Sequence, residues 1–133
     1  MNNKLAKLFL RIGLAFVFVY ASVEIYIHPE NFLKYVPQFM LDLVPMQLFL
    51  DVFGVVEVAL ALWILSGWKG QYSAMIAVLL IAGITFANTE YFYILFRNVA
   101  IACGGMALIF LEANLLEANL QKDKDFGFHK KYS

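Results

Sequence analysis

Cysteine, histidine and charge are scarce in this sequence, and each shortage excludes a class of function. The single cysteine, Cys103, excludes an internal disulfide and any Cys-x-x-Cys redox or metal motif. No glycine-rich phosphate loop is present, and no serine has a histidine and an acid within plausible reach. The formal net charge of zero argues against a nucleic-acid partner. The chain therefore carries no complete active site of the soluble type, and we expect no catalytic activity from it alone.

Apolar side chains, by contrast, are abundant. Hydrophobic residues make up 62% of the 133 residues, charged residues only 15%, and the mean hydropathy is +0.73. A soluble domain of this size leaves a large fraction of its surface in water, so it could not bury so much apolar area. We therefore interpret the chain as a membrane protein whose solvent is the lipid bilayer.

Four mostly apolar runs predict four helices that cross the bilayer. A run of about 20 residues, rising ~1.5 Å per residue, spans the hydrocarbon layer. The predicted spans are residues 5–27, 48–66, 71–89 and 97–116. We thus predict an all-α fold, a four-transmembrane-helix bundle in a single domain over residues 1–120, followed by a polar cytoplasmic tail at 121–133.

The first run also has features of a secretory signal peptide. Lys4, Lys7 and Arg11 precede a stretch without charge, as the basic region of a signal peptide does. We favour a spanning helix, because the apolar run continues to Ile27 and three more predicted spans follow.

The segment between the first two spans is too polar and too interrupted to cross the membrane. Pro29, Pro37 and Pro45 divide it, and large apolar residues are mixed with charged ones. We interpret it as one or two amphipathic helices that lie at the membrane interface and cover one end of the bundle. The alternative is an ordinary loop outside the membrane.

Lysine and arginine gather on one side of the predicted membrane. Four crossings put both termini on the same side, and only Lys34 and Arg97 lie on the other. The terminal side carries Lys4, Lys7, Arg11, Lys69, Lys122, Lys124, Lys130 and Lys131. The positive-inside bias then places both termini in the cytoplasm. His28 and His129 fall on opposite sides, so they cannot together bind a metal or a haem.

Charged residues inside the predicted spans are the candidate functional residues. Glu57 lies near the middle of the second span, where an ionised carboxylate costs ~2.5–3.5 kcal/mol and usually faces a partner or a polar cavity. Helical phase and depth predict that some charged residues form a group in the outer half of the membrane, and that two others form a pair near its cytoplasmic surface. The outer group is Glu24, Asp51, Glu57 and Arg97, and the inner ion-pair candidates are Arg11 and Glu112.

These charges fit two interpretations. Ion pairs of Arg97 with Asp51 or Glu57, and of Arg11 with Glu112, would simply fasten the helices. Alternatively, the outer group has more acids than its single arginine can pair, which suits it to handling a proton or to hydrogen bonding a polar ligand headgroup. The substitution Glu57→Gln separates the two, because unchanged ligand binding or activity would defeat the functional interpretation.

Several short motifs mark the ends and contacts of the predicted spans. They are Arg11-Ile12-Gly13, Ala21-Ser22 followed by His28-Pro29 and Phe32, Gly54-x-x-Glu57 with Gly67, and Arg97-Asn98 followed by Gly104-Gly105. In the order and spacing of these motifs, the chain resembles the DoxX family of small four-helix membrane proteins over residues 5–115. One departure is Glu24-Ile25, where that family commonly has a basic residue.

The resemblance implies a multi-pass protein of the bacterial inner (plasma) membrane, with no agreed catalytic residues to transfer. It also implies an accessory subunit of a quinone- or thiol-linked redox system, with other redox-complex subunits or a second copy of the chain as partners. The bundle would then hold a quinone or other lipid-like molecule between the outer carboxylates and an aromatic rim at residues 91–96. Two other classes stay open: a small solute or proton carrier that uses Glu57 and Arg97, and a structural membrane scaffold.

Overall fold

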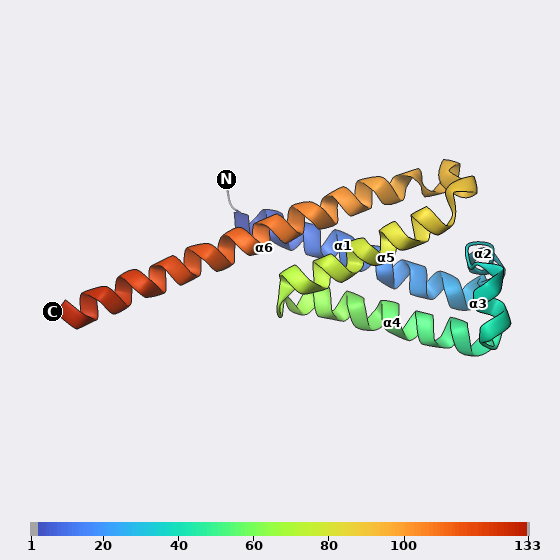
Figure 1. Ribbon diagram of the computed structural model, residues 1–133, viewed down its shortest axis with the longest axis horizontal. Coiled ribbons are helices and arrows are strands. Elements are labelled where there is room, and N and C mark those ends of the chain that lie inside the picture. Colours follow the sequence, from blue (N-terminus) through green and yellow to red (C-terminus); the bar gives the residue numbers. More distant parts are fainter. Residues whose placement is uncertain (1–2, 133) are drawn as a thin grey trace.

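The chain folds almost entirely into α-helices (Figure 1). The computed structural model describes residues 3–132, without the side chains of residues 91–94. The helices are, in chain order, α1 (Asn3–Ile27), α2 (Pro29–Leu33), α3 (Gln38–Leu43), α4 (Met46–Ser66), α5 (Gly70–Ala87), the 3-10 helix η1 (Thr89–Tyr91) and α6 (Phe92–Tyr132). Within residues 3–132 there is no strand, and four helices, α1, α4, α5 and α6, are long and apolar enough to cross a membrane. The predicted all-α fold with four spanning helices is confirmed.

The four long helices lie side by side as a bundle with two different ends (Figure 1). α1 packs mainly on α4, and α5 packs mainly on α6. The short helices α2 and α3 lie at one end of the bundle, which we call the α2–α3 end. At the other end the α4–α5 turn lies beside α6, which continues past the bundle to the C-terminus, and we call this the terminal end (Figure 1).

Small residues let the spanning helices approach closely. Ala61, Ala74 and Ala77 are completely buried between helices. A side-chain carbon added at Gly105 would lie 2.5 Å from Cγ2 of Val78, so the α5–α6 contact needs a glycine at this position. The rest of the core is Leu14, Ala15, Phe18, Leu60, Ile64, Ile81 and Leu108. Close approach over small residues is a common way for helices to associate in lipid, where the hydrophobic effect does not drive them together.

Large apolar side chains cover the outside of the bundle. Phe16, Val55 and Phe86, from three of the spanning helices, are all more exposed than buried, and Phe86 is 81% exposed. Such a surface would be unstable in water but suits contact with lipid chains. The bundle is therefore apolar both inside and out over most of its length, although the carboxyl of Glu57 is buried near the middle of α4.

The interfacial segment predicted between the first two spans forms the short helices α2 and α3. Aromatic contacts hold α2 against α4, with the ring centroids of Phe32 and Phe53 5.0 Å apart. Asn88, buried at the end of α5, donates a hydrogen bond from Nδ2 to the carbonyl oxygen of Tyr35 at 2.8 Å. These contacts fasten the segment across the end of the bundle, where it borders the cavity described below.

The last helix is longer than predicted. We predicted a span that ends near residue 116, a helix that continues past the lipid to about residue 120, and a polar tail from 121, whereas α6 continues unbroken to Tyr132. Residues 116–132 are all exposed, so packing on the bundle does not explain this extension. Nine of its 17 residues are Leu, Glu, Ala, Gln or Lys, which favour helix, and it has no proline. Its polar composition thus marks where the helix leaves the apolar bundle, not where the helix ends.

Candidate functional site

A cavity of about 500 Å³ lies between α1, α6 and the segment that starts with α2. Its walls are Phe16, Val17, Tyr20, Ala21, Glu24, Asn31, Phe32, Tyr35, Arg97, Asn98 and Ile101. Most of these side chains are apolar or aromatic, and a few are polar, which is the usual make-up of a small-molecule site. The volume falls in the range of ~300–1,000 Å³ that such sites commonly have.

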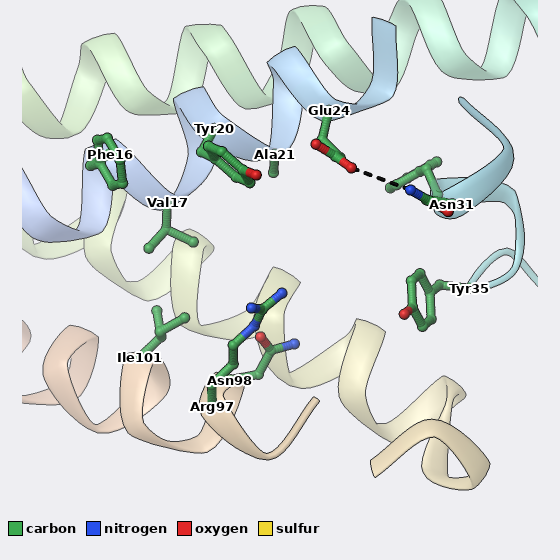
Figure 2. A pocket seen from close by; sticks show the side chains of 11 residues that line it. Phe16, Val17, Tyr20, Ala21, Glu24, Asn31, Tyr35, Arg97, Asn98 and Ile101 are labelled. Atoms are coloured by element: carbon green, nitrogen blue, oxygen red, sulfur yellow. Dashed lines mark hydrogen bonds between the residues drawn. The ribbon is translucent and has the colours of Figure 1, made fainter. Parts of the chain in front are cut away.

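One face of α1 supplies much of the aromatic wall. Phe16, Tyr20 and Glu24 recur every four residues, so helical phase places them on a single stripe. The rings of Phe16 and Tyr20 are stacked with their centroids 6.3 Å apart. Along this stripe α1 changes from an apolar surface to a carboxylate, and Tyr35 borders the cavity from another side (Figure 2).

Glu24 and Arg97 border the same cavity without forming an ion pair. Figure 2 shows the Arg97 guanidinium projecting from α6 into the middle of the cavity, toward the side that α1 forms. Glu24 instead accepts a hydrogen bond from Nδ2 of Asn31 at 3.4 Å. Arg97 forms no ion pair or hydrogen bond with any residue in the described part of the chain. The guanidinium, which has five N–H donors, therefore borders a cavity with aromatic rings in its wall.

A side-chain hydrogen bond fixes α6 beside Arg97. Asn98 donates from Nδ2 to Oγ1 of Thr85 on α5 at 3.2 Å. The Thr85 hydroxyl in turn donates to the carbonyl oxygen of Ile81 at 2.8 Å. This chain of hydrogen bonds sets the rotation of α6 about its axis, and with it the direction in which Arg97 leaves the helix.

The other two residues of the predicted outer group lie away from this cavity. Glu57 is buried in α4 and 2% exposed, and its Oε2 has no hydrogen-bond partner among the described residues. Asp51 is exposed and accepts a hydrogen bond from Nε2 of Gln47 at 3.2 Å. Neither carboxylate lines the cavity or pairs with Arg97 in the described part of the chain, so the expected outer ion pair is not formed.

The geometry of α4 explains this difference. Asp51 and Glu57 are six positions apart, which separates them by about a third of a turn around the helix. α4 turns Glu57 inward and leaves Asp51 on its outer surface. Arg97 belongs to α6, which packs mainly on α5 and α1, so it reaches the stripe of α1 that carries Glu24.

The structure brings the predicted inner residues together at the terminal end. Nη2 of Arg11, on α1, donates to Oε1 of Glu112 on α6. Nζ of Lys7 lies 3.2 Å from the other oxygen of the same carboxylate. Arg11 also lies 3.5 Å from the carbonyl oxygen of Gly67, in the α4–α5 turn. Lys7 was not among the predicted residues, although its spacing of four from Arg11 places the two on one face of α1.

Sequence reasoning also missed most of the cavity wall. It expected an aromatic rim at residues 91–96, but the side chains of 91–94 lie outside the described part of the chain, and Phe96 is exposed and does not line the cavity. Described aromatic residues of the wall come from α1, α2 and the residues after α2. The four-residue spacing of Phe16, Tyr20 and Glu24 is the signal that could have found it.

The arrangement suits binding better than bond making. Among the described residues, no group of three or more His, Cys, Asp or Glu side chains could hold a metal ion. The cavity offers a cation, a carboxylate and flat apolar rings. These groups can hold a flat molecule that has oxygen acceptors at one end and an apolar body.

Fold and cavity together define a class: a multi-pass membrane protein with a pocket of ligand size between its helices. Residues 3–116 match the family model described as methylamine utilisation protein MauE, so the chain belongs to the MauE family, a family of membrane proteins. The expected DoxX family is therefore wrong. The motifs behind that resemblance are short, and some of them, such as His28-Pro29 and Gly104-Gly105, lie at a helix end or a close helix contact, which other small helical membrane proteins also need. No curated protein and no solved structure matches the chain.

Proposed function

We propose that this protein is an accessory membrane subunit of a redox system, and that its cavity holds the head of a quinone or a similar lipid-like molecule. The observation that carries the proposal is Arg97, whose guanidinium enters an aromatic-walled cavity of about 500 Å³ without a partner among the described residues. A cation held in this way is available to a ligand.

The chemistry of a quinone head matches the residues present. Its two carbonyl oxygens accept hydrogen bonds, which Arg97 can donate, and its flat ring can stack on aromatic side chains such as Phe16 and Tyr20. Glu24 could accept a hydrogen bond from the hydroxyl of the reduced form. The quinone would supply two-electron redox chemistry when bound, and the chain's own residues would bind and orient it.

Family membership supports the redox assignment independently. The family description links these proteins to methylamine utilisation. Conversion of methylamine and water to formaldehyde and ammonia releases two electrons and two protons, so a system that uses methylamine in this way needs an electron acceptor. A small membrane protein that binds a quinone fits an accessory place in such a system. A thiol-linked role would need a second chain, since Cys103 is the sole cysteine.

We also propose that the protein lies in a bacterial plasma membrane with both termini in the cytoplasm. Eight of the ten lysine and arginine residues belong to the terminal side of the four spans, and the positive-inside bias favours that side facing inward. The cavity with Arg97 and Glu24 would then open in the outer half of the membrane.

A carrier is less well supported by the geometry. Such a carrier would need Glu57 and Arg97 on one path, and Glu57 is buried in α4 and does not line the cavity that Arg97 enters. A pure scaffold would have no need for a guanidinium that lines a cavity and forms no ion pair with the described residues. Flux of a solute or proton through liposomes that hold this protein alone would support the carrier instead.

The proposal is tested by titrating the detergent-purified protein with a short-chain quinone in a calorimeter. Arg97→Gln is expected to weaken binding by about tenfold or more, because a hydrogen bond from a charged donor is lost. A hydrocarbon of matched chain length without the quinone head serves to measure simple partition into the micelle.

Two variants provide matched controls. Lys34→Gln removes an exposed cation next to the α2 segment that does not line the cavity, and Glu57→Gln removes the buried carboxyl of α4. Both are expected to bind the quinone like the unmodified protein. The proposal fails if Arg97→Gln binds as well as these controls, or if the quinone binds no better than the hydrocarbon.

A further inference from the structure

A second cavity, of about 330 Å³, lies at the terminal end, beside the α4–α5 turn. Figure 1 places this turn next to α6, where α6 leaves the bundle. The cavity is bordered by Lys7 from α1, Lys69 and Gly70 from the turn, Tyr72 from α5, and Glu112 and Asn119 from α6. Four elements therefore meet around it, and none of its lining residues belongs to the walls of the first cavity.

Positive charge dominates the surroundings of this second cavity. Lys7, Arg11 and Lys69 lie in or beside it, against the single carboxylate of Glu112. Both oxygens of Glu112 are already engaged, one by Lys7 and the other by Arg11. The negative charge of Glu112 is thus neutralised by two cationic side chains of the protein itself. Its presence in the wall does not cancel the charge of Lys69, which has no ion-pair partner among the described residues.

The α4–α5 turn packs tightly against these charged side chains. At Gly67, with φ +71°, an added side-chain carbon would collide with the Arg11 guanidinium, and at Gly70 it would collide with the Glu112 carboxylate. Lys69 itself has a left-handed backbone, with φ 46°. Gly70 begins α5 and lines the cavity, so the start of this helix is also near the cavity. The first N–H groups of a helix lack acceptors within the helix.

From this arrangement we infer that the second cavity binds one phosphate group, carried either by the headgroup of an anionic phospholipid or by free phosphate. Two lysines and a helix start provide donors for a phosphate. Because the carboxylate of Glu112 is already paired, the surroundings keep a net positive charge. The cavity lies where two predicted spans end, which is the depth of lipid headgroups. Trp68 and Tyr72 beside it are residue types enriched at that depth. Basic pockets between helix ends are known to hold such headgroups.

The inference is tested by native mass spectrometry of the delipidated, detergent-purified protein. The probes are phosphatidylglycerol, phosphatidylcholine of the same chain length, and inorganic phosphate. We expect phosphatidylglycerol to bind preferentially, and the double substitution Lys7→Gln with Lys69→Gln to weaken it about tenfold. Lys122→Gln, which removes an exposed cation of α6 outside the cavity, is the matched control and should change binding little.

Inorganic phosphate separates the two sources of the group. If millimolar phosphate displaces the lipid, the site takes a free phosphate, and if it does not, the site requires the lipid. Lys69→Gln alone decides the question if the double variant folds poorly, because Lys69 forms no ion pair with the described residues. Equal binding of the two lipids, or unchanged phosphatidylglycerol binding to folded Lys69→Gln, would overturn the inference.

Discussion

At the scale of single residues, the surroundings of a charge decide what it does. Arg11 and Arg97 are the two arginines of the chain, and they have opposite environments. Arg11 is paired with Glu112 and lies near a carbonyl oxygen of the α4–α5 turn, whereas Arg97 enters a cavity without a described partner. We propose a structural role for the first and a binding role for the second.

Helical phase predicts part of this arrangement. It places Arg11 and Glu112 at similar depth near the terminal end, and the structure brings them together. It could not predict which of Glu24, Asp51 and Glu57 faces Arg97. Phase relates residues on one helix to one another, but the rotation of each helix toward its neighbours depends on packing, here on contacts such as Asn98 with Thr85.

Gly70→Ala is expected to destabilise the protein by about 1–3 kcal/mol, the usual range for overpacking a tight contact. The added methyl group would collide with the carboxylate of Glu112 and disturb its pairing with Arg11. The midpoint of unfolding in detergent, followed by circular dichroism, measures the change.

Gly83→Ala is the matched control for this substitution. It lies in the same helix, and an added carbon there has nothing within 4 Å, so it should leave stability unchanged or raise it by up to about 1 kcal/mol. Equal effects of the two substitutions would show that the α4–α5 turn does not need the small residue.

At the scale of elements, hydropathy predicted the bounds of three long helices well and those of the fourth poorly. The observed bounds of α1, α4 and α5 lie within two residues of the predicted spans. α6 instead begins at Phe92 and extends to Tyr132, because a hydropathy pattern reports contact with lipid and not the length of the helix. The segment after residue 116 is helical by its own propensity, which hydropathy does not measure.

The carboxyl group at the start of α2 predicts how the stability of this helix depends on pH. The backbone N–H of Glu30, and secondly the His28 ring 3.3 Å away, hold the pKa of the Glu30 carboxyl below its usual 4.5. A lowered pKa in the folded state means that the ionised form favours the folded α2. This contribution is complete above pH 4.5 and is lost as the pH falls through the lower, folded value.

A carbon-13 NMR titration of the glutamate carboxyls measures this pKa directly. The signal of Glu30 is identified by its loss in Glu30→Gln, and we expect its midpoint below pH 4.5. A midpoint at or above that value would show that the start of α2 does not stabilise the carboxylate.

At the scale of the whole molecule, the bundle separates two kinds of polar site. The α2–α3 end holds a cavity lined by aromatic rings and by a cation that has no ion-pair partner among the described residues, and the terminal end holds a charge cluster that surrounds one carboxylate. Composition and hydropathy were sufficient to predict the class of fold. They were not sufficient for the family, because motifs such as Arg11-Ile12-Gly13 and His28-Pro29 are too short to distinguish one family of small helical membrane proteins from another.

We propose that Arg97 retains a quinone in the cavity at the α2–α3 end. The most direct test of this proposal is mass spectrometry of the solvent extract from detergent-purified protein, with Arg97→Gln and Lys34→Gln prepared in parallel. We predict quinone in roughly equimolar amount with the unmodified protein and with Lys34→Gln, and its loss from Arg97→Gln. An unmodified protein without quinone, or an Arg97→Gln variant that retains as much of it, would contradict the account.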